Sequence, residues 1–411
     1  MANDSGNGRG VQVADLKRMN ARAVLAALRA TGPATAPELA ALLGITKPTV
    51  SASLKRLAAA SLVSSLGVRA GGIGRSPEVW ETNEHAGVVL ALDVGSRVVQ
   101  AAIGSLSGAV LARSRQPLRD TSPEAVLAAI SAATDAVLLE SEAWAAATPE
   151  PAFTVIGVPG AVNPSDLGIR LATNLPGLSD PMVTAALRDR FGERFDLQKD
   201  VYLAARGELR VRPPEARDFV LLTLGRGVGA AIVRDGEPVL GTTGFAGEVG
   251  YLPLGPHTTA SPDEPALERA ASRDGLLAAA ARAGLRLDDV GELFSAAASG
   301  DQRAVTVLAA EADLVAYALA TLVVATNPAG VVLAGSIALH GGDPFCRAVR
   351  ARLDQRLPFD APPVEIARTG PEATLLGALA VAAERGWEVL ADEIDQPDAG
   401  SQSLAPQRAA G

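Results

Sequence analysis

The segment VLLTLGRGVGAAIVRDG, residues 220–236, decides the fold class of this 411-residue chain. It has the pattern of an apolar strand, a glycine-bearing turn at 225–227, a second strand and a tight turn at Asp235–Gly236, and a third short strand, EPVLG, follows. The same order occurs earlier: VLALDVG (89–95), VVQAAIG, a turn at Ser107–Gly108, and AVLA. A unit that recurs about 130 residues later predicts two similar lobes.

Helical patterns follow each copy, at about 123–146 and then at 264–284 and 302–326. Strand units followed by helices predict an α/β body in which two lobes face each other across a cleft. Glycine in the turns would let backbone N–H groups approach a phosphate closely. A tight hairpin explains either turn alone, so the matched pair is what favours a phosphate site.

Helical patterns also precede residue 60. The first predicted helix has the apolar stripe Leu16, Met19, Val24, Leu25 and Leu28. Thr35 and Glu38 form a capping box that begins a second helix, and Gly44 ends it. The second helix is expected to bury Leu39, Leu42 and Leu43.

A third helix, capped by Thr46, has the predicted inner face Val50, Leu54 and Leu57. Its polar side chains are the candidates for contacts with DNA: Thr46, Lys47, Thr49, Ser51, Ser53 and Lys55. Two strand-like runs, 62–68 and 77–82, then flank a glycine-rich loop with Arg69 and Arg75 near its tip. This order predicts a winged helix-turn-helix. The alternative is a three-helix packing module with a solvated polar face.

Charge supports this division of the chain. Residues 1–84 hold ten Lys and Arg against six Asp and Glu, whereas the remainder holds 27 against 40. Phosphate contacts act locally, so an acidic protein can bind DNA through one basic module. The acidic remainder is not expected to wrap nucleic acid.

The expected domains are a head at 13–84 and a body at 85–389, with lobes 85–215 and 216–389. Residues 1–12 and 390–411 are polar and are expected to be disordered tails. The single cysteine, Cys346, excludes an internal disulfide and fits a reducing cytoplasm. No basic start followed by an apolar run and no uninterrupted apolar run of about 18 residues is evident, so neither export nor a membrane span is expected.

The order of motifs from Asn20 to Trp387 resembles the ROK family (repressors, open reading frames and kinases), in particular its sugar-responsive transcriptional regulators. The motifs are LDVGSR (92–97), GVPG (157–160), ATNLPG (172–177), KDVYLAARGE (199–208), TLGRGVGAAIVRDG (223–236), AGEVGY (246–251), ALERAAS (266–272) and NPAGVVLAGS (327–336). The resemblance implies a winged helix-turn-helix followed by an actin-like, hexokinase-type body of two lobes.

Both phosphate loops depart from the family's kinases. In the kinases the first loop has the pattern D-x-G-G-T, whereas here Asp93 and Gly95 are followed by Ser96 and Arg97. The other loop has the pattern G-T-G in the kinases, and here Arg226 stands between Gly225 and Gly227. An arginine fills space that a phosphate needs, although its charge can also attract one. We therefore expect no nucleotide cofactor and no kinase activity.

The resemblance implies a sugar site at Gly160, Asn174, Lys199, Asp200, Glu248, Tyr251 and Glu268. Asp200 stands at the position of the family's catalytic base, but it is also placed to cap the helix that follows. Glu248 and Glu268 match acceptors of sugar hydroxyls, with solvated surface positions as the alternative. Lys199 replaces an asparagine and would favour an anionic sugar derivative, unless it points outward. Tyr251 would change the character of the pocket or pack against the loop that follows it.

The resemblance also implies the loss of a zinc site. Family members place a histidine where Tyr251 stands and then a cysteine-rich loop, and the twenty residues that follow Tyr251 contain no cysteine. Structural zinc needs three or four nitrogen or sulfur ligands, which His257 alone cannot supply. We therefore expect no metal.

These observations predict a cytoplasmic transcriptional regulator, a repressor rather than an activator, that responds to a sugar or sugar derivative. A homodimer or homotetramer on a palindromic double-stranded DNA operator is expected, because two-fold proteins read two-fold sites. Two alternatives stay open. One is an active sugar kinase with an added DNA-binding head, and the other is a ligand-blind regulator whose body only forms oligomers.

Overall fold

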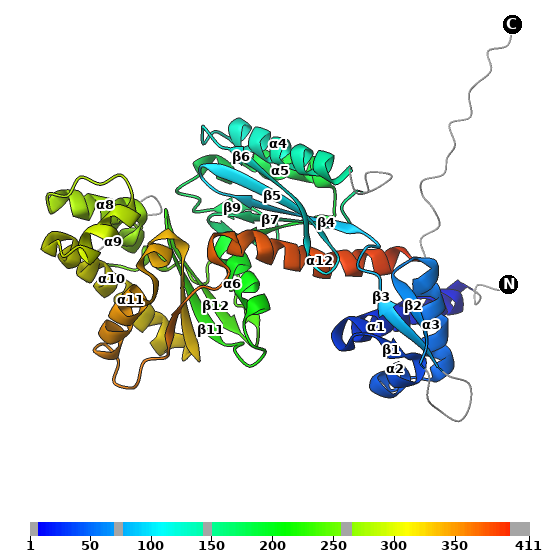
Figure 1. The fold of residues 1–411 in the computed structure, drawn as a ribbon. Coiled ribbons are helices and arrows are strands. Elements are labelled where there is room, and N and C mark those ends of the chain that lie inside the picture. The colour runs from blue at the N-terminus through cyan, green and yellow to red at the C-terminus, as the bar shows by residue number, and fades with distance from the viewer. Residues whose placement is uncertain (1–6, 70–76, 143–149, 256–264, 395–411) are drawn as a thin grey trace, which may run out of the picture.

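The computed structural model describes residues 7–69, 77–142, 150–255 and 265–394. The described chain forms a small N-terminal head and two α/β lobes, and one long helix, α12 (Ala373–Glu393), extends from the lobes to the head (Figure 1). The predicted fold class, a winged helix-turn-helix followed by an actin-like body, is confirmed.

The head is a winged helix-turn-helix. Its elements are α1 (Asn7–Thr31), β1 (Ala34–Thr35), α2 (Ala36–Leu43), α3 (Lys47–Ala59), β2 (Val63–Val68) and β3 (Glu78–Thr82). The strands form an antiparallel sheet in the order β1-β3-β2. The predicted capping box of Thr35 and Glu38 is present, and Gly44 ends α2 with a left-handed φ of 65°.

The head core joins Val24, Leu25 and Leu28 of α1 to Val50, Leu54 and Leu57 of α3. Two residues of the apolar stripe on α1 lie outside this core, and Leu42 was wrongly predicted to be buried. Leu16 and Met19 are 57% and 63% exposed, because α1 reaches the core only from Ala21 onward. Leu42 is exposed because the short helix α2 turns only the side of Leu39 and Leu43 toward the core.

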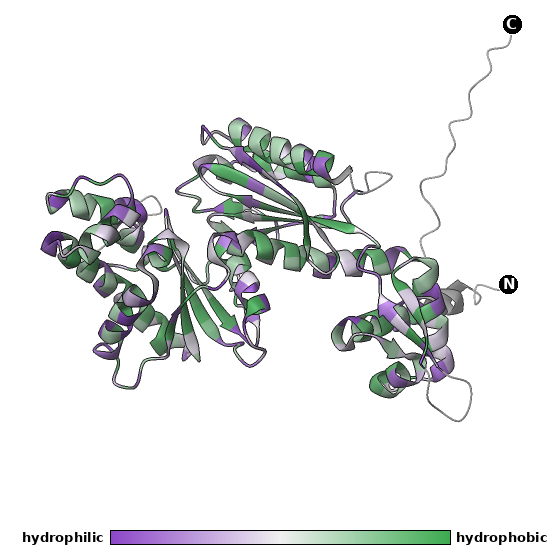
Figure 2. Cartoon of the chain, in the orientation of Figure 1, coloured by the Kyte–Doolittle hydropathy of each residue, from purple (hydrophilic) through white to green (hydrophobic). Residues whose placement is uncertain are grey.

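Each lobe contains a five-stranded mixed sheet. The sheet of lobe 1 has the order β10-β7-β4-β5-β6, and that of lobe 2 the order β13-β12-β11-β14-β15. In both, three antiparallel strands in sequence are followed by two strands that add in parallel on the far side of the first. The predicted internal repeat is thus a repeat of topology. The strands of both sheets are mainly hydrophobic (Figure 2).

The elements of lobe 1 are β4 (Val88–Val94), β5 (Val98–Ser105), β6 (Val110–Pro117), α4 (Pro123–Glu142), β7 (Thr154–Val158), β8 (Ala161–Val162), β9 (Ile169–Arg170), the 3₁₀ helix η1 (Pro176–Ser179), α5 (Pro181–Phe191), β10 (Phe195–Lys199) and α6 (Asp200–Val211). Those of lobe 2 are β11 (Phe219–Leu224), β12 (Val228–Arg234), β13 (Glu237–Pro238), η2 (Val249–Tyr251), α7 (Ala266–Ala271), α8 (Arg273–Arg282), α9 (Val290–Ala298), α10 (Gln302–Thr326), β14 (Gly330–Ala334), α11 (Gly335–Asp354), β15 (Val364–Ile366) and η3 (Gly370–Glu372), and α12 follows.

The two lobes exchange their last helices. Helix α6 follows the sheet of lobe 1 but packs on the sheet of lobe 2, where Ala205 joins the cluster that contains Leu221. Helix α12 follows lobe 2 but packs on the sheet of lobe 1, where Leu379 joins the cluster of Val89. The predicted division into contiguous lobes, 85–215 and 216–389, is therefore wrong for α6 and α12, because the apolar face of each helix packs on the other sheet.

Helices α6 and α12 cross very closely. A Cβ atom at Gly377 would lie 1.8 Å from the carbonyl oxygen of Leu203, and one at Gly207 would lie 2.4 Å from that of Ala373. Only glycine allows this approach. Because α6 packs on lobe 2 and α12 on lobe 1, this crossing joins the two lobes.

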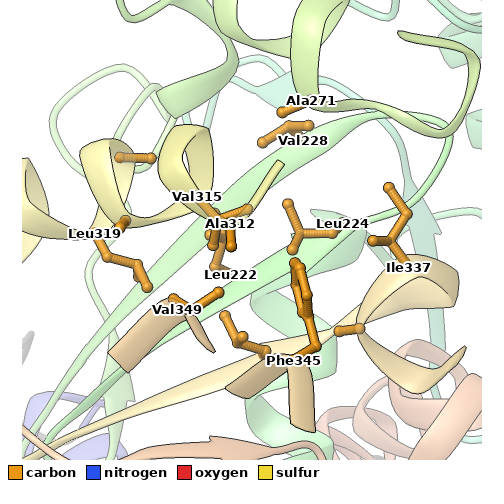
Figure 3. Close-up of a cluster of buried hydrophobic side chains, with 14 of the residues drawn as sticks. Leu222, Leu224, Val228, Ala271, Ala312, Val315, Leu319, Ile337, Phe345 and Val349 are labelled. Carbon is orange, nitrogen blue, oxygen red and sulfur yellow. The ribbon is translucent and has the colours of Figure 1, made fainter. Parts of the chain in front are cut away.

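The core of lobe 2 lies between its sheet and helices α10 and α11 (Figure 3). Helix α10, predicted at the same residues, is the one helix in the described ranges that is long and apolar enough to cross a membrane. Half of its most apolar stretch is buried within the fold. Val315 and Leu319 contact the core, so α10 packs here as a core helix.

Some predicted boundaries differ from the structure. The helix predicted at 264–284 is divided at Ser272, whose side chain accepts a hydrogen bond from the Gly275 N–H and begins α8. Helix α1 already begins at Asn7, since no proline interrupts the segment. At the other end of the chain, α12 continues to Glu393 because Val389 and Leu390 pack on the core. The predicted tails, 1–12 and 390–411, therefore overlap helices. Their remaining residues, like Arg75, His257 and the end of the predicted helix 123–146, lie outside the described residues.

Candidate functional site

A cavity of about 570 Å³ lies between the lobes, at the ends of their strands. It is lined by all the residues predicted for the sugar site: Gly160, Asn174, Lys199, Asp200, Glu248, Tyr251 and Glu268. It is also lined by Asp93, Gly95, Gly225, Arg226 and Gly227 of the phosphate loops, but not by Arg97. The fold thus brings together residues that are far apart in the chain, from Asp93 to Thr374.

Strand ends position the lobe 1 side of the cleft. Strands β7 and β10 are parallel neighbours, so the turn at Gly160 and the residues Lys199 and Asp200 come to the same edge of the sheet. Gly160 has a φ of 90°, and a Cβ atom there would lie 2.5 Å from the carbonyl oxygen of Arg170. This floor of the cleft therefore requires glycine.

Asp200 lies partly buried in the cleft, at the first position of α6. Lys199, not Asp200, is the N-cap residue, so the interpretation of Asp200 as a helix cap is wrong. Burial raises the pKa of Asp200 to about 6, although the charge of Lys199 and a hydrogen bond from the Val201 N–H oppose this shift. Burial and the nearby Asp200 raise the pKa of Asp93 to about 7. The cleft thus holds two carboxyl groups that titrate near neutral pH.

Lys199 points into the fold and not outward, since it is only 3% exposed. Its ammonium lies 2.7 Å from Glu248 Oε1 and 5.4 Å from the centre of the Tyr202 ring. The positive charge that would attract an anionic ligand is therefore already paired. The alternative of a solvated surface position is wrong for Glu248, whose side chain is 17% exposed.

Glu268 connects the two lobes. One carboxylate oxygen accepts a hydrogen bond from the Val228 N–H at 2.9 Å, and the other accepts one from Thr173 Oγ1 at 3.2 Å. Burial raises the pKa of Glu268. The surface alternative is wrong here too, because both oxygens are engaged in the cleft. Sequence reasoning missed Thr173, although it stands beside Asn174 in the ATNLPG motif.

The two loops that stand at the phosphate-loop positions contact each other. The guanidinium of Arg226, between β11 and β12, donates to Ser96 Oγ, between β4 and β5, at 3.0 Å. Burial, and then the charge of Arg97, lower the pKa of Arg226. In the same loop a Cβ atom at Gly227 would lie 2.8 Å from Glu268 Oε2. The loop backbone thus lies tightly against the predicted sugar-binding side chains.

Tyr251 lines the cleft at the end of η2. Among the described residues, no three His, Cys, Asp or Glu side chains are grouped so that they could hold a metal ion. His257 lies outside the described residues. The expectation of no zinc remains a prediction.

The second candidate site is the outer face of α3. Lys47 and Lys55 are exposed, and Ser51 is partly buried. Ser53 was wrongly predicted to be on this face, because it is 4% exposed and adjoins the buried Leu54. The hydroxyl groups of Thr46 and Thr49 lie 2.8 Å apart and are engaged in the cap of the helix.

The open part of α3 therefore consists of two lysines with small side chains between them, since Pro48 and Ala52 are also exposed. Sequence reasoning missed Ala52 because it considered only polar residues. A methyl group in this position can contact a thymine methyl in a major groove. Arg69, at the base of the wing, forms an ion pair with Glu38 at 2.7 Å, and about half of each side chain remains exposed.

Comparisons with known proteins agree with this division. A family model described as the ROK family matches residues 89–385, and one described as the MarR family matches residues 14–71. An N-acetylmannosamine kinase of Salmonella heidelberg (strain SL476) is 30% identical over 303 residues, which cover 71% of this chain and 97% of the kinase.

Two solved structures extend the comparison. A ROK family transcriptional regulator, described as a homologue of the E. coli MLC protein, has a TM-score of 0.74 at 18% identity and covers 92% of this chain and 98% of its own. A ROK hexokinase from Thermus thermophilus has a TM-score of 0.60 at 29% identity, covering 71% of this chain and 97% of its own. The likeness to the regulator includes the head, whereas the kinase covers only the body.

Proposed function

Because the chain belongs to the ROK family, we propose that it is a DNA-binding transcriptional regulator, a cytoplasmic repressor, whose cleft binds a sugar or sugar derivative. The MarR-type winged helix supports DNA binding, and the ROK body supports a sugar-like effector. The proposed DNA contacts are made by Lys47, Ser51, Ala52 and Lys55 of α3 and by Arg69. Arg75, which lies outside the described residues, is proposed from the sequence alone.

The observation that carries the proposal is the path of α12 (Figure 1). Its first turn lies at the cleft, where Thr374 lines the cavity and donates from Oγ1 to the Asp200 carbonyl at 3.3 Å. Its last turns contact α1 of the head. Twenty-one residues of helix span about 32 Å, so one rigid element connects the effector site to the DNA-reading module.

Specific contacts join α12 to the head and to lobe 1. The indole N–H of Trp387 donates to the Leu106 carbonyl at 2.8 Å, and the Arg29 guanidinium lies 5.7 Å from the centre of the indole ring. Arg22 forms an ion pair with Asp392. These contacts support a head whose orientation follows that of α12.

An effector that binds the two lobe arrangements with different affinity would shift α12 and, with it, the head. In a homodimer or homotetramer this shift would change the spacing of two heads on a palindromic operator. The acidic body and basic head fit this division, because only the head would approach the phosphates.

The test is selection of bound fragments from genomic DNA, followed by binding measurements on the selected site at several salt concentrations. Replacing Lys47 and Lys55 by alanine should weaken binding to all sequences and reduce the slope of log affinity against log salt by about one for each lost phosphate contact. The control is Lys17→Ala, at an exposed position of α1. No selected site, or equal loss in the control, would contradict the proposal.

A second candidate function is sugar phosphorylation, and two observations favour it. The N-acetylmannosamine kinase relative covers nearly its whole length, and Asp200 lies in the cleft with a pKa suited to a general base. Against it, Arg226 occupies the second phosphate loop and reaches Ser96. We therefore propose a regulator without kinase turnover.

A further inference from the structure

Three side-chain contacts cross the cleft within the described residues. Arg226 reaches Ser96 at the phosphate loops, Glu268 accepts from Thr173, and Lys199 pairs with Glu248. In each pair one residue belongs to the strands or strand connections of lobe 1, and the other follows a strand of lobe 2. The lobes are thus joined by the cleft's own side chains.

Two of these contacts depend on the residues at which the sequence departs from the family's kinases. Lys199 stands where an asparagine is expected, and Arg226 stands where a threonine is expected. Neither shorter side chain could make the same contact, because the long cationic side chains are what reach the opposite lobe. The departures therefore do more than remove phosphate binding, since they add connections between the lobes.

Lys199 already engages a carboxylate that a hydroxyl-bearing ligand would need. Its ammonium donates to Glu248 Oε1 within a buried site, and this carboxylate is an expected acceptor of ligand hydroxyls. A buried ion pair is costly to separate, because removal of one partner leaves an uncompensated charge. A ligand that reached Glu248 would have to displace Lys199 or share the carboxylate with it.

Arg226 has the corresponding role at the phosphate loops. Its guanidinium is partly buried, and burial together with the charge of Arg97 lowers its pKa. Both effects disfavour the charged guanidinium at this position. The hydrogen bond to Ser96 links the two hairpin turns that would otherwise face each other across the cleft. Separation of the two turns would break this contact.

We propose that Lys199 and Arg226 are internal ligands that hold the two lobes together in the absence of an effector. Effector binding then exchanges the Lys199–Glu248 contact for contacts with the effector. The inference rests on the proposed function only in taking the cleft as the sensor, and it concerns the resting arrangement of the lobes, which can be measured without DNA.

The experiment is pulsed electron paramagnetic resonance on the full chain without ligand. Spin labels are placed on the exposed positions Glu124 of α4 and Arg282 of α8, each changed to cysteine in a Cys346→Ala background. The parent protein should have one narrow main distance, with about a tenth or less of the population at a longer distance. Lys199→Asn with Arg226→Thr should raise the longer-distance population to about half.

The matched controls are Arg217→Thr and Arg206→Asn. Arg217 donates a hydrogen bond to the Asp235 carbonyl within lobe 2. Arg206 of α6 forms an ion pair with Glu237 of lobe 2, the lobe on which α6 packs. Both remove an arginine contact without removing a contact across the cleft. They should leave the parent distribution unchanged.

Ser96→Ala and Glu248→Gln change the partners of Arg226 and Lys199 and so weaken the same two contacts. They replace the first variants if a change at Lys199 or Arg226 prevents folding, and they should also add the longer distance. An unchanged distribution in the variants that fold, or an equal change in the controls, overturns the proposal. The two proposals can fail separately. If the protein binds no DNA but the variants add the longer distance as expected, the proposed function is wrong and this inference stands.

Discussion

Glu311 provides a quantitative test of how lobe 2 is packed. It lies on α10 and is 2% exposed, and its Oε1 atom has no hydrogen-bond partner among the described residues. Burial raises its pKa from the ordinary 4.5 to about 8. The side chain is therefore mainly protonated at neutral pH in the folded protein and ionised in the unfolded chain.

The sign of the effect follows from this difference. A raised pKa means that the fold favours the neutral acid, so the cost is absent below about pH 4.5 and grows as the pH rises toward 8. With 1.36 kcal/mol for each pKa unit, the cost is about 1 kcal/mol at pH 5.5, about 3 at pH 7 and about 5 at pH 8.5.

Glu311→Gln removes the ionisable group and keeps the shape of the side chain. Urea unfolding followed by far-ultraviolet circular dichroism should give a variant more stable than the parent, with a difference that widens by about 3 kcal/mol between pH 5.5 and pH 8.5. Glu292→Gln, at an exposed position on α9, is the control and should give no such trend. A difference that stays constant over this pH range would refute the reasoning.

Three further predictions concern the cleft. A coupled assay with ATP, magnesium and a panel of hexoses and N-acetylhexosamines should remain at background, and turnover of about one per second that Asp200→Asn abolishes would contradict the interpretation as a regulator. Metal analysis should find well under one zinc per chain, and a chelator should leave the melting temperature unchanged, whereas stoichiometric zinc would show that ligands lie elsewhere. Neutral sugars should stabilise the protein at least as well as sugar phosphates or acids, since Glu248 neutralises Lys199, and a ligand at 100 times its dissociation constant should add about 2.7 kcal/mol. A preference for anions that Lys199→Met removes would contradict this last prediction.

Local patterns were enough to predict much of the fold. The capping box of Thr35 and Glu38, the turn at Asp235–Gly236 and helix α10 each depend on residues within a few positions of one another. Apolar runs bounded by glycine-bearing turns identified the first three strands of each lobe for the same reason. The composition of the cleft was also predictable, because the motifs that line it occur in the order expected of the family.

Errors arose where burial depends on a neighbour that is distant in sequence. A helical pattern alone did not show that Ser53 lies against the head core or that α1 projects beyond it at Leu16 and Met19. Likewise, no local signal indicated that α6 and α12 exchange lobes. That exchange depends on the fit of Gly377 against Leu203, which are more than 170 positions apart.

The sequence by itself therefore determined the class of each part, a basic winged head on an acidic body of two lobes, because periodicity, capping and charge are short-range properties. Only the tertiary structure decided what the unusual residues do. Lys199 and Arg226 appeared in the sequence as altered site residues, and the fold places their cations against Glu248 and Ser96 of the opposite lobe. An ion pair or hydrogen bond depends on distance in space, and across 49 or 130 positions of chain that distance is set by packing.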